Sequence, residues 1–189
     1  LHVVRCFEDG NVPFEYETID PVRDIETVDL ELLAADSTTL DNKIKRLAKK
    51  VRSGDKDAIR ENADCEKVYA AIQQGIPARK QGLSATERAS IYECNLVSLK
   101  PVVYIANIKS MEDMANRHVA ALKQFACAEG AEMIAVCGKD EADISQLEPD
   151  EQQEFLQELG LEKSSMERLL GAAYQMLGLI TFFTTGEDE

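Results

Sequence analysis

Hydrophobic residues along this chain occur in two patterns, which predict two kinds of element. Unbroken apolar runs cover residues 102–106 and 133–137, as is typical of strands that are buried on both faces of a parallel sheet. Between these runs, apolar positions at helical spacing predict a helix over residues 112–129, which ends at Gly130. A strand, a helix and a second strand in this order imply a parallel pair joined by a right-handed crossover.

The residues before the first buried run predict a series of helices. Asp20 and Pro21 form an N-cap and a first-turn proline, and a helix through Leu33 follows. Two further helices are joined by a turn at residues 53–55, and they predict an antiparallel helical hairpin over residues 36–77. The hairpin has apolar residues at helical spacing at Leu40, Ile44, Leu47, Val51, Cys65, Val68 and Ile72.

Further elements are predicted near both ends of the chain. Residues 1–7 predict a strand that starts with no turn or cap before it, as expected of a chain cut from a longer one. Ser84, with Glu87 three residues later, has the pattern of a capping box and predicts a helix start. Two acidic helices are expected between residues 150 and 177, and the apolar residues 179–184 predict a last strand.

Composition narrows the class of protein. A chain of 189 residues with 44% hydrophobic and 30% charged residues fits a helix-rich α/β protein and excludes a disordered one. No apolar run approaches the ~18 residues of a membrane span, and no signal peptide is present, so we expect a cytoplasmic protein with no membrane partner. Five cysteines without a C-x-x-C pair indicate reduced thiols, and neither a disulfide framework nor a zinc site.

Charge is distributed unevenly along the chain. The net charge is −14, but residues 43–56 contain seven basic side chains and one acid. Lys45, Lys49 and Arg52 are the basic residues of this segment that we single out on the first arm of the expected hairpin. Two interpretations stay open: these side chains solvate the outside of a coiled coil, or they bind the phosphates of RNA on a ribosome.

The residues that follow the two buried strands are candidates for a binding site. Asn107 follows the run 102–106, and Gly138 and Lys139 follow Cys137. Ligands in open α/β folds bind beyond the carboxyl ends of parallel strands, so these residues are placed to contact a nucleotide base. Their spacing matches the base-recognition half of a P-loop NTPase. The alternative for Asn107 is that its amide caps the following turn.

Two features of P-loop NTPases are missing from these residues. The third residue after Asn107 is Ser110, whereas GTPases carry there an acid that accepts two hydrogen bonds from guanine, so this loop cannot make the guanine clamp. No G-x-x-x-x-G-K sequence followed by Ser or Thr occurs. We therefore expect no phosphate-binding loop, no metal ligand and no catalytic residue here, and no nucleotide hydrolysis by this chain alone.

Six segments of the chain resemble the Obg-like ATPase family, the YchF type of P-loop NTPase related to translation factors. These segments are HVVRCFED (His2 to Asp9), DPVRDIETV (Asp20 to Val28), ELLAAD (Glu31 to Asp36), LKPVVYIAN (Leu99 to Asn107), FLQELGLEKS (Phe155 to Ser164) and LGLITFFTTGEDE (Leu177 to Glu189). They occur in the same order as in the family, and the similarity covers nearly the whole chain.

The resemblance implies an α/β fold, in which the C-terminal half of a P-loop NTPase parallel sheet carries an inserted antiparallel helical hairpin, a coiled coil. Residues 1–35 and 78–189 would be part of the nucleotide-binding domain, and residues 36–77 would be the inserted arm. The P-loop and switch part and the C-terminal TGS domain of the family would lie outside this chain, which would be a middle portion of the protein.

The resemblance also assigns the base-binding residues. Family members prefer ATP over GTP through an N-x-x-E motif, and Asn107 and Ile108 match its first two positions. Ser110 replaces the Glu, and the acids at 112–113 lie close by. Gly138 and Lys139 match the second base-contacting loop of the family.

The resemblance further implies that the intact protein is a ribosome-associated hydrolase that binds ATP, or GTP, together with Mg²⁺. A different class of function fits the same sequence. In this alternative the chain is a non-catalytic interaction module, whose helical hairpin binds RNA or a protein and whose α/β part is a platform. A phosphate-binding loop upstream of Leu1 would favour the enzyme.

Overall fold

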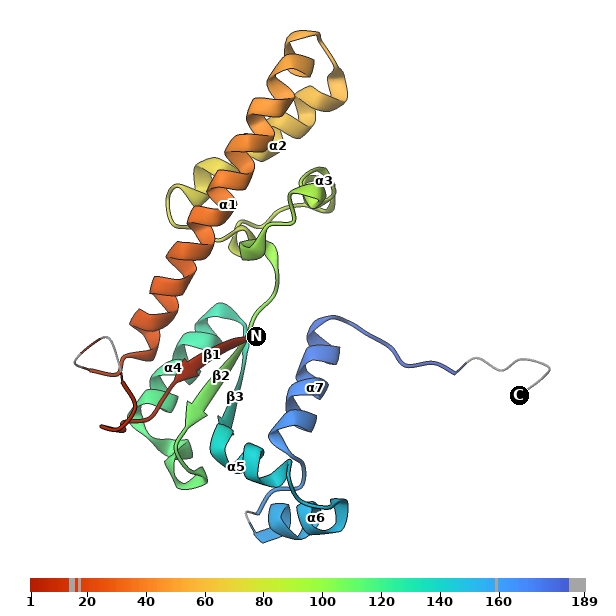
Figure 1. The fold of residues 1–189 in the computed structure, drawn as a ribbon. Coiled ribbons are helices and arrows are strands. Elements are labelled where there is room, and N and C mark those ends of the chain that lie inside the picture. The colour runs from red at the N-terminus through yellow and green to blue at the C-terminus, as the bar shows by residue number, and fades with distance from the viewer. Residues whose placement is uncertain (14–15, 17, 159, 184–189) are drawn as a thin grey trace, which may run out of the picture. The chain divides into compact units, whose positions relative to one another are not determined.

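The computed structural model describes residues 1–13, 16, 18–158 and 160–183 (Figure 1). The chain divides into two compact units: one comprises Leu1–Val22 and Val102–Glu189, and the other comprises Arg23–Pro101. We call them the sheet unit and the helical unit, and describe each by itself.

The sheet unit is built on three parallel strands in the order β1 (His2–Arg5), β2 (Val103–Ile108) and β3 (Glu132–Cys137). β2 is the middle strand, and five of its six residues are buried, because neighbouring strands flank it and helices pack on both of its faces. The two unbroken apolar runs thus form the parallel pair that the sequence predicts.

One face of the sheet is covered by α4 (Arg117–Glu129), which connects β2 to β3. The Tyr104 ring of β2 is fully buried and meets Phe125 edge-on, with 5.8 Å between ring centroids. The Tyr104 hydroxyl donates to Glu129 Oε2 at 3.0 Å, which satisfies the polar end of the ring. α4 ends at Gly130 as predicted, and the φ of 65° at this residue is one that glycine adopts without strain.

α4 begins later than the sequence predicts, because residues 111–115 form a short 3-10 helix and Asn116 then starts the α-helix. The Asn116 Oδ1 accepts from the backbone N–H groups of His118 and Val119, each at 2.9 Å. The amide nitrogen of the same side chain donates to the Cys6 carbonyl at 2.8 Å. Asn116 therefore joins the start of α4 to the end of β1.

The other face of the sheet is covered by α7 (Ser165–Met176), which packs on β3; Figure 1 shows α4 and α7 on opposite sides of the strands. Between β3 and α7 lie α5 (Gly138–Ile144) and α6 (Pro149–Glu158). The buried core under α7 consists of Val103, Ile134 and Ala172. α6 and α7 are the two helices expected between residues 150 and 177.

The predicted last strand over residues 179–184 is wrong for its described part, since residues 179–183 form neither strand nor helix. Thr184 lies outside the described residues. Ile180, Phe182 and Phe183 are largely exposed. Apolar residues alone do not make a strand, which needs a neighbour for its backbone groups, and the described sheet pairs only β1, β2 and β3.

α1 (Pro21–Arg52), most of which belongs to the helical unit, is a single helix of 32 residues where the sequence predicts two. The polar residues between its apolar stretches do not interrupt it. The Thr38 and Thr39 hydroxyls donate to the carbonyls of Ala34 and Ala35 at 3.0 and 3.1 Å. These side chains bond back to the preceding turn and so leave the helix intact.

α2 (Lys56–Ile72) follows a turn at residues 53–55 and runs back alongside α1 (Figure 1). Gly54 in this turn has a φ of 82°, and Asp55 caps α2 by accepting from two backbone N–H groups. The buried core of the helical unit is formed by Leu33, Leu40, Leu47, Ala58, Cys65, Val68, Ile72, Ala78, Leu83, Ile91 and Leu96. That the two helices form an inserted coiled coil stays a prediction.

The segment after α2 is fastened to the middle of α1. Asp36 is 3% exposed, and its carboxylate accepts from the backbone N–H groups of Val97 and Ser98 at 2.8 and 2.7 Å. The Ser98 hydroxyl in turn accepts from the Ala78 N–H at 3.2 Å. α3 (Ala85–Ser90) lies in this segment and begins with the predicted capping box. The compact unit therefore includes more of the chain than residues 36–77. The assignment of residues 36–77 as an inserted arm stays a prediction.

Candidate functional site

The carboxyl ends of the three strands meet at one edge of the sheet. The strand register places Arg5 of β1 opposite Asn107, and the Cys6 N–H donates to the Asn107 carbonyl at 2.8 Å. From β3, the Cys137 thiol donates to the Lys109 carbonyl at 3.2 Å. Burial raises the pKa of this thiol, which keeps it protonated as a donor. The loops after β1, β2 and β3 are thus bonded to one another.

Asn107 and Gly138, which the sequence predicts to contact a base, lie next to each other at this edge. A Cβ built on Gly138 would lie 3.5 Å from the Asn107 Oδ1. Asn107 is half-buried, and among the described residues its side-chain amide makes no hydrogen bond. The amide does not cap η4 (Met111–Ala115), because that helix begins at Ser110 without any side-chain cap. The turn-cap alternative for Asn107 therefore has no support in the described residues.

The other two predicted base-binding residues differ in exposure. Ile108 is 2% exposed, so its side chain belongs to the interior beneath the edge. Lys139 is exposed in the first turn of α5. Among the described residues, no hydrogen bond or ion pair engages its ammonium group. Lys139 can therefore turn toward a ligand at the edge, whereas the Ile108 side chain lies in the interior below it, and a base-binding role stays a prediction for both residues.

Ser110 stands three residues after Asn107, at the position where the resemblance predicts an acid. Ser110 is half-buried, and its carbonyl accepts from the Asp113 N–H at 3.0 Å. Glu112 is exposed, and Lys109 forms an ion pair with Asp9 of the β1 loop at 3.2 Å. The loop therefore carries a hydroxyl, and no carboxylate, at this position.

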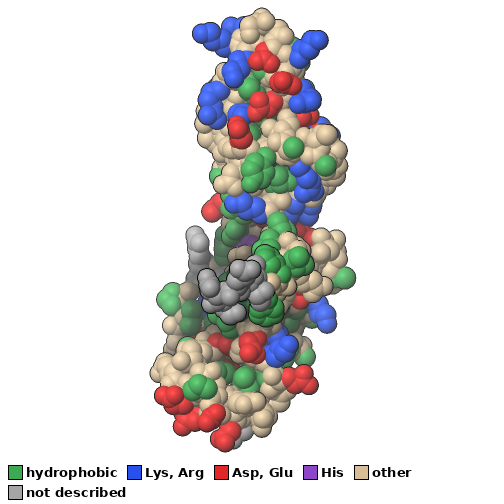
Figure 2. Space-filling model, turned by 90° about the vertical axis from the view of Figure 1, so that its right-hand side faces the viewer, with side chains coloured by type: hydrophobic (Ala, Val, Ile, Leu, Met, Phe, Trp, Pro, Cys, Tyr) green, Lys and Arg blue, Asp and Glu red, His purple; other side chains and the backbone are tan. Residues whose placement is uncertain are grey.

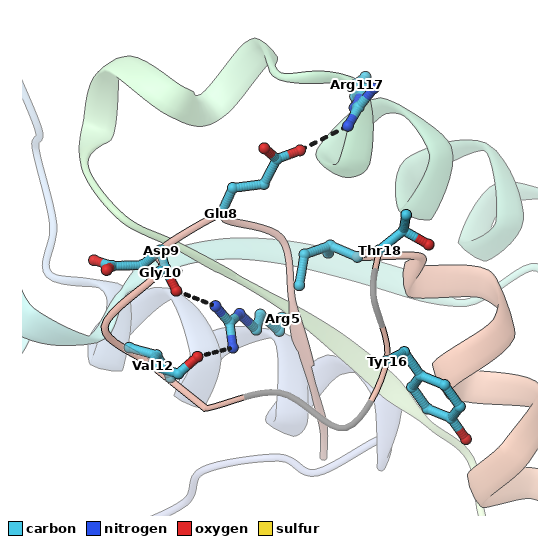
Figure 3. Close-up of a pocket in the computed structure, with 9 residues that line it drawn as sticks. Arg5, Glu8, Asp9, Gly10, Val12, Tyr16, Thr18 and Arg117 are labelled. Carbon is cyan, nitrogen blue, oxygen red and sulfur yellow. Dashed lines mark hydrogen bonds and ion pairs between the residues drawn. The ribbon is translucent and has the colours of Figure 1, made fainter.

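A cavity of about 420 Å³ lies beside the loop after β1, and Arg5 forms part of its wall (Figure 3). The Arg5 guanidinium donates to the carbonyls of Phe7, Asp9 and Val12 at 3.1, 3.2 and 3.4 Å, and it stacks 4.7 Å from the Phe7 ring centroid. Sequence reasoning missed this arrangement. The one feature of the sequence that indicates it is a charged residue, Arg5, inside the otherwise apolar strand predicted for residues 1–7.

Glu8 bridges the same loop to the start of α4. Its Oε1 accepts from Arg117 Nη2 at 2.6 Å (Figure 3). The same oxygen lies 3.3 Å from His118 Nε2. The hydrogen bond to His118, and then the Arg117 guanidinium, lower the pKa of Glu8. His118 is 8% exposed, and its Nε2 accepts from Arg117 Nε at 3.4 Å as well as lying near the Glu8 carboxylate. None of the predicted base-binding residues lines the Arg5 cavity.

The basic residues singled out on α1 lie on one face of that helix. Lys45 pairs with Asp41 one turn away, whereas Lys49 and Arg52 are exposed and make no ion pair with any described residue. Figure 2 shows Lys and Arg side chains gathered around the end of the hairpin. We call Lys45, Lys49 and Arg52 the basic stripe.

The described residues contain no group of three or more His, Cys, Asp and Glu side chains that could hold a metal ion. In the same residues, no helix is both long and apolar enough to cross a membrane.

The fold and the edge define an α/β class in which parallel strands present their carboxyl ends to a ligand. A solved structure of this class, the YchF GTPase of Schizosaccharomyces pombe, superimposes with a TM-score of 0.82 and 27% sequence identity. The match covers 98% of this chain and 51% of that one.

Curated relatives match the whole of this chain. The ribosome-binding ATPase YchF of Bacillus subtilis is 39% identical over 191 residues, and that of Escherichia coli O157:H7 is 39% identical over 188 residues. Each match covers 100% of this chain and 52% of the relative, so the chain spans about half the length of the curated relatives it matches. No family model matches the chain. The predicted resemblance is confirmed: the whole of this chain is homologous to part of YchF.

Proposed function

We propose that this chain is the base-recognising part of a cytoplasmic, ribosome-associated protein that binds and hydrolyses ATP or GTP. Asn107 reads the base from the end of β2, and Gly138 and Lys139 border the base from the end of β3. The helical arm contacts RNA or a protein of the translation machinery.

The observation that carries this proposal is the Asn107 amide, which has no hydrogen-bond partner among the described residues and faces a glycine. A half-buried amide that bonds to none of the described residues is available to a ligand, because it has only water to exchange for new hydrogen bonds. Gly138 leaves the space beside the amide that a side chain would fill. The names of the relatives, ribosome-binding ATPase and GTPase, support a nucleotide as that ligand.

The phosphates and Mg²⁺ do not fit the residues present here. The described residues hold no acidic cluster for a cation, and the sequence has no phosphate-binding loop. In the proposal these groups are bound by other parts of the intact protein. We therefore expect this chain alone to release no phosphate from ATP or GTP. Because Ser110 replaces the acid that distinguishes bases, we also expect weak discrimination between adenine and guanine.

The test is the Asn107→Ala variant of the full-length protein. Loss of the amide weakens ATP binding by about 1–3 kcal/mol, since the base loses its hydrogen bonds to a buried group. Titration calorimetry measures the affinity, and Asn42→Ala, at an exposed position of α1, is the matched control. Unchanged ATP affinity in Asn107→Ala would refute the base-reading role.

The basic stripe favours a second, compatible function, because Lys49 and Arg52 are exposed and unpaired among the described residues. Phosphate binding by such side chains releases counterions, so ribosome binding should depend on salt. Charge reversal to Glu at all three positions should lower the amount of protein that pellets with ribosomes. It should also reduce the slope of log affinity against log salt by about three. Pelleting that responds to neither the reversal nor the salt would show that the stripe only solvates the helix.

A further inference from the structure

The loop from Asn107 to Asn116 is fastened at both ends to Cys6, the residue that follows β1. At the first end, the Asn107 carbonyl accepts from the Cys6 N–H at 2.8 Å. At the second end, the Asn116 side-chain nitrogen donates to the Cys6 carbonyl at 2.8 Å. All three residues belong to the sheet unit, and Cys6 is 0% exposed. Both backbone groups of one buried residue therefore close the loop that begins with the proposed base reader.

Two other side-chain bonds hold the same loop, and both are weaker by their chemistry. The Lys109 ammonium pairs with Asp9 at 3.2 Å, but the Lys109 side chain is 59% exposed, and water screens exposed ion pairs. The Cys137 thiol donates to the Lys109 carbonyl at 3.2 Å, and a thiol is a weak donor. The bond from Asn116 joins an amide to the carbonyl of a buried residue, so it is the strongest of the three.

The start of α4 holds the Asn116 side chain in one orientation. The Asn116 Oδ1 caps the helix by accepting from the N–H groups of His118 and Val119. Val119 and Leu122 of this helix are buried, and the helix packs on β2 and β3, so the cap belongs to a fixed element. An amide can cap with its oxygen and donate with its nitrogen at the same time, whereas a carboxylate in the same place can only accept.

We propose that Asn116 is a positioning residue for base recognition: it closes the loop against Cys6 and so keeps the Asn107 amide beside Gly138 before a nucleotide binds. This inference rests on the base-reading role proposed above for Asn107. Asn116 acts through the loop and not on the ligand, because Cys6 and α4 engage both ends of its amide. A Cβ on Gly138 would lie only 3.5 Å from the Asn107 Oδ1, so a small shift of the loop changes the space beside the amide.

A loop that is fixed in advance favours binding of a base, since it does not have to become ordered when the ligand arrives. Loss of the bond to Cys6 leaves this ordering to the binding step, which lowers the affinity. The loss should depend on the base, because in our proposal other parts of the intact protein bind the phosphates. ATP and inorganic tripolyphosphate, which has no base, therefore distinguish positioning of the base from a general loss of structure.

The experiment uses the full-length protein and two variants of Asn116. Asn116→Asp keeps the cap and the shape of the side chain but has no donor for the Cys6 carbonyl, and Asn116→Ser keeps a cap without adding a charge. Titration calorimetry should give an ATP affinity about tenfold lower in both variants, and an unchanged affinity for inorganic tripolyphosphate. Asn42→Asp, at an exposed position of α1, is the matched control and should bind both ligands as the wild type does.

Amide hydrogen exchange gives a second readout, which needs no nucleotide. The Cys6 N–H, which donates to the Asn107 carbonyl, should exchange faster in both Asn116 variants than in the wild type or in Asn42→Asp. Unchanged exchange at Cys6 would overturn the proposal.

The binding data can overturn the proposal in two ways. The first is that both Asn116 variants bind ATP as the wild type does, while Asn107→Ala binds it more weakly. The second is that the affinities for ATP and tripolyphosphate fall alike. If Asn107→Ala also binds ATP normally, the base-reading role itself has failed, and the positioning role of Asn116 fails with it.

Discussion

A bonded carboxylate in the helical unit contrasts with an unbonded amide at the edge of the sheet unit. In the helical unit, the Asp36 carboxylate accepts from two backbone N–H groups, and Arg79 pairs with Asp29 at 3.0 Å, although Gln81 Oε1 is buried there without a partner among the described residues. At the edge of the sheet unit, the half-buried Asn107 amide has no partner within the described residues. The contrast indicates that Asp36 and Arg79 hold the helical unit together, whereas in our proposal the Asn107 amide binds a ligand.

The strongest test of this contrast is Asp36→Ala. The substitution leaves the Val97 and Ser98 N–H groups without an acceptor, and an unsatisfied buried donor costs about 1–3 kcal/mol. We expect the free energy of unfolding of the helical unit to fall by about 3 kcal/mol. Urea denaturation followed by circular dichroism measures this loss. Asp41→Ala, on the same helix but partnered only with the exposed Lys45, should change little, and equal losses in the two variants would contradict the role of Asp36.

Gly138→Ala tests the proposed ligand site at the edge of the sheet unit. The new Cβ would lie in ordinary contact with the Asn107 Oδ1, and at the first residue of α5 alanine should change the free energy of unfolding little. The same Cβ occupies the space proposed for the base, so nucleotide affinity of the full-length protein should fall several-fold. Gly171→Ala, at an open position of α7, should stabilise without affecting the affinity. Equal nucleotide affinities in the two variants would remove Gly138 from the site.

The smallest expected effect concerns Glu87 of the helical unit. The ion pair with Lys67, and then the capping bonds to Ser84, lower the pKa of Glu87 from 4.5 to about 2. Because the folded-state pKa is lowered, the contribution of Glu87 to stability is complete above pH 4.5 and is lost as the pH falls toward 2. Glu87→Gln should flatten the pH dependence of the unfolding free energy in this window. An NMR titration that gives Glu87 an ordinary pKa would contradict this.

Sequence patterns predicted the parts of the fold that depend on local chemistry. The apolar runs of β2 and β3 and the left-handed Gly130 follow from burial and from backbone sterics, which act within a few residues. The juxtaposition of Asn107 and Gly138 followed from the rule that parallel strands end at one edge. Their role in binding a base remains a proposal.

The features that the sequence did not reveal depend on partners elsewhere in the chain. Thr38 and Thr39 are compatible with a helix end and with a continuous helix. The helix continues because their hydroxyls bond to the carbonyls of the preceding turn, which the sequence pattern does not show. Residues 179–183 are apolar enough for a strand but have no neighbouring strand in the described sheet. The Arg5 cavity depends on backbone carbonyls, which every residue type supplies, so the charged residue in the first strand does not by itself show which groups it will bind.

Asn116 couples the end of β1 to the start of α4 within the sheet unit. Its side-chain nitrogen donates to the Cys6 carbonyl, and its side-chain oxygen accepts from the N–H groups of His118 and Val119, the second and third residues of α4. A displacement of the strand end at Cys6 would therefore pull directly on the first turn of α4. We therefore expect the loop with Glu8 and Asp9 to move together with the first turn of α4, which carries Arg117 and His118. Asn116 is the residue that couples the two segments.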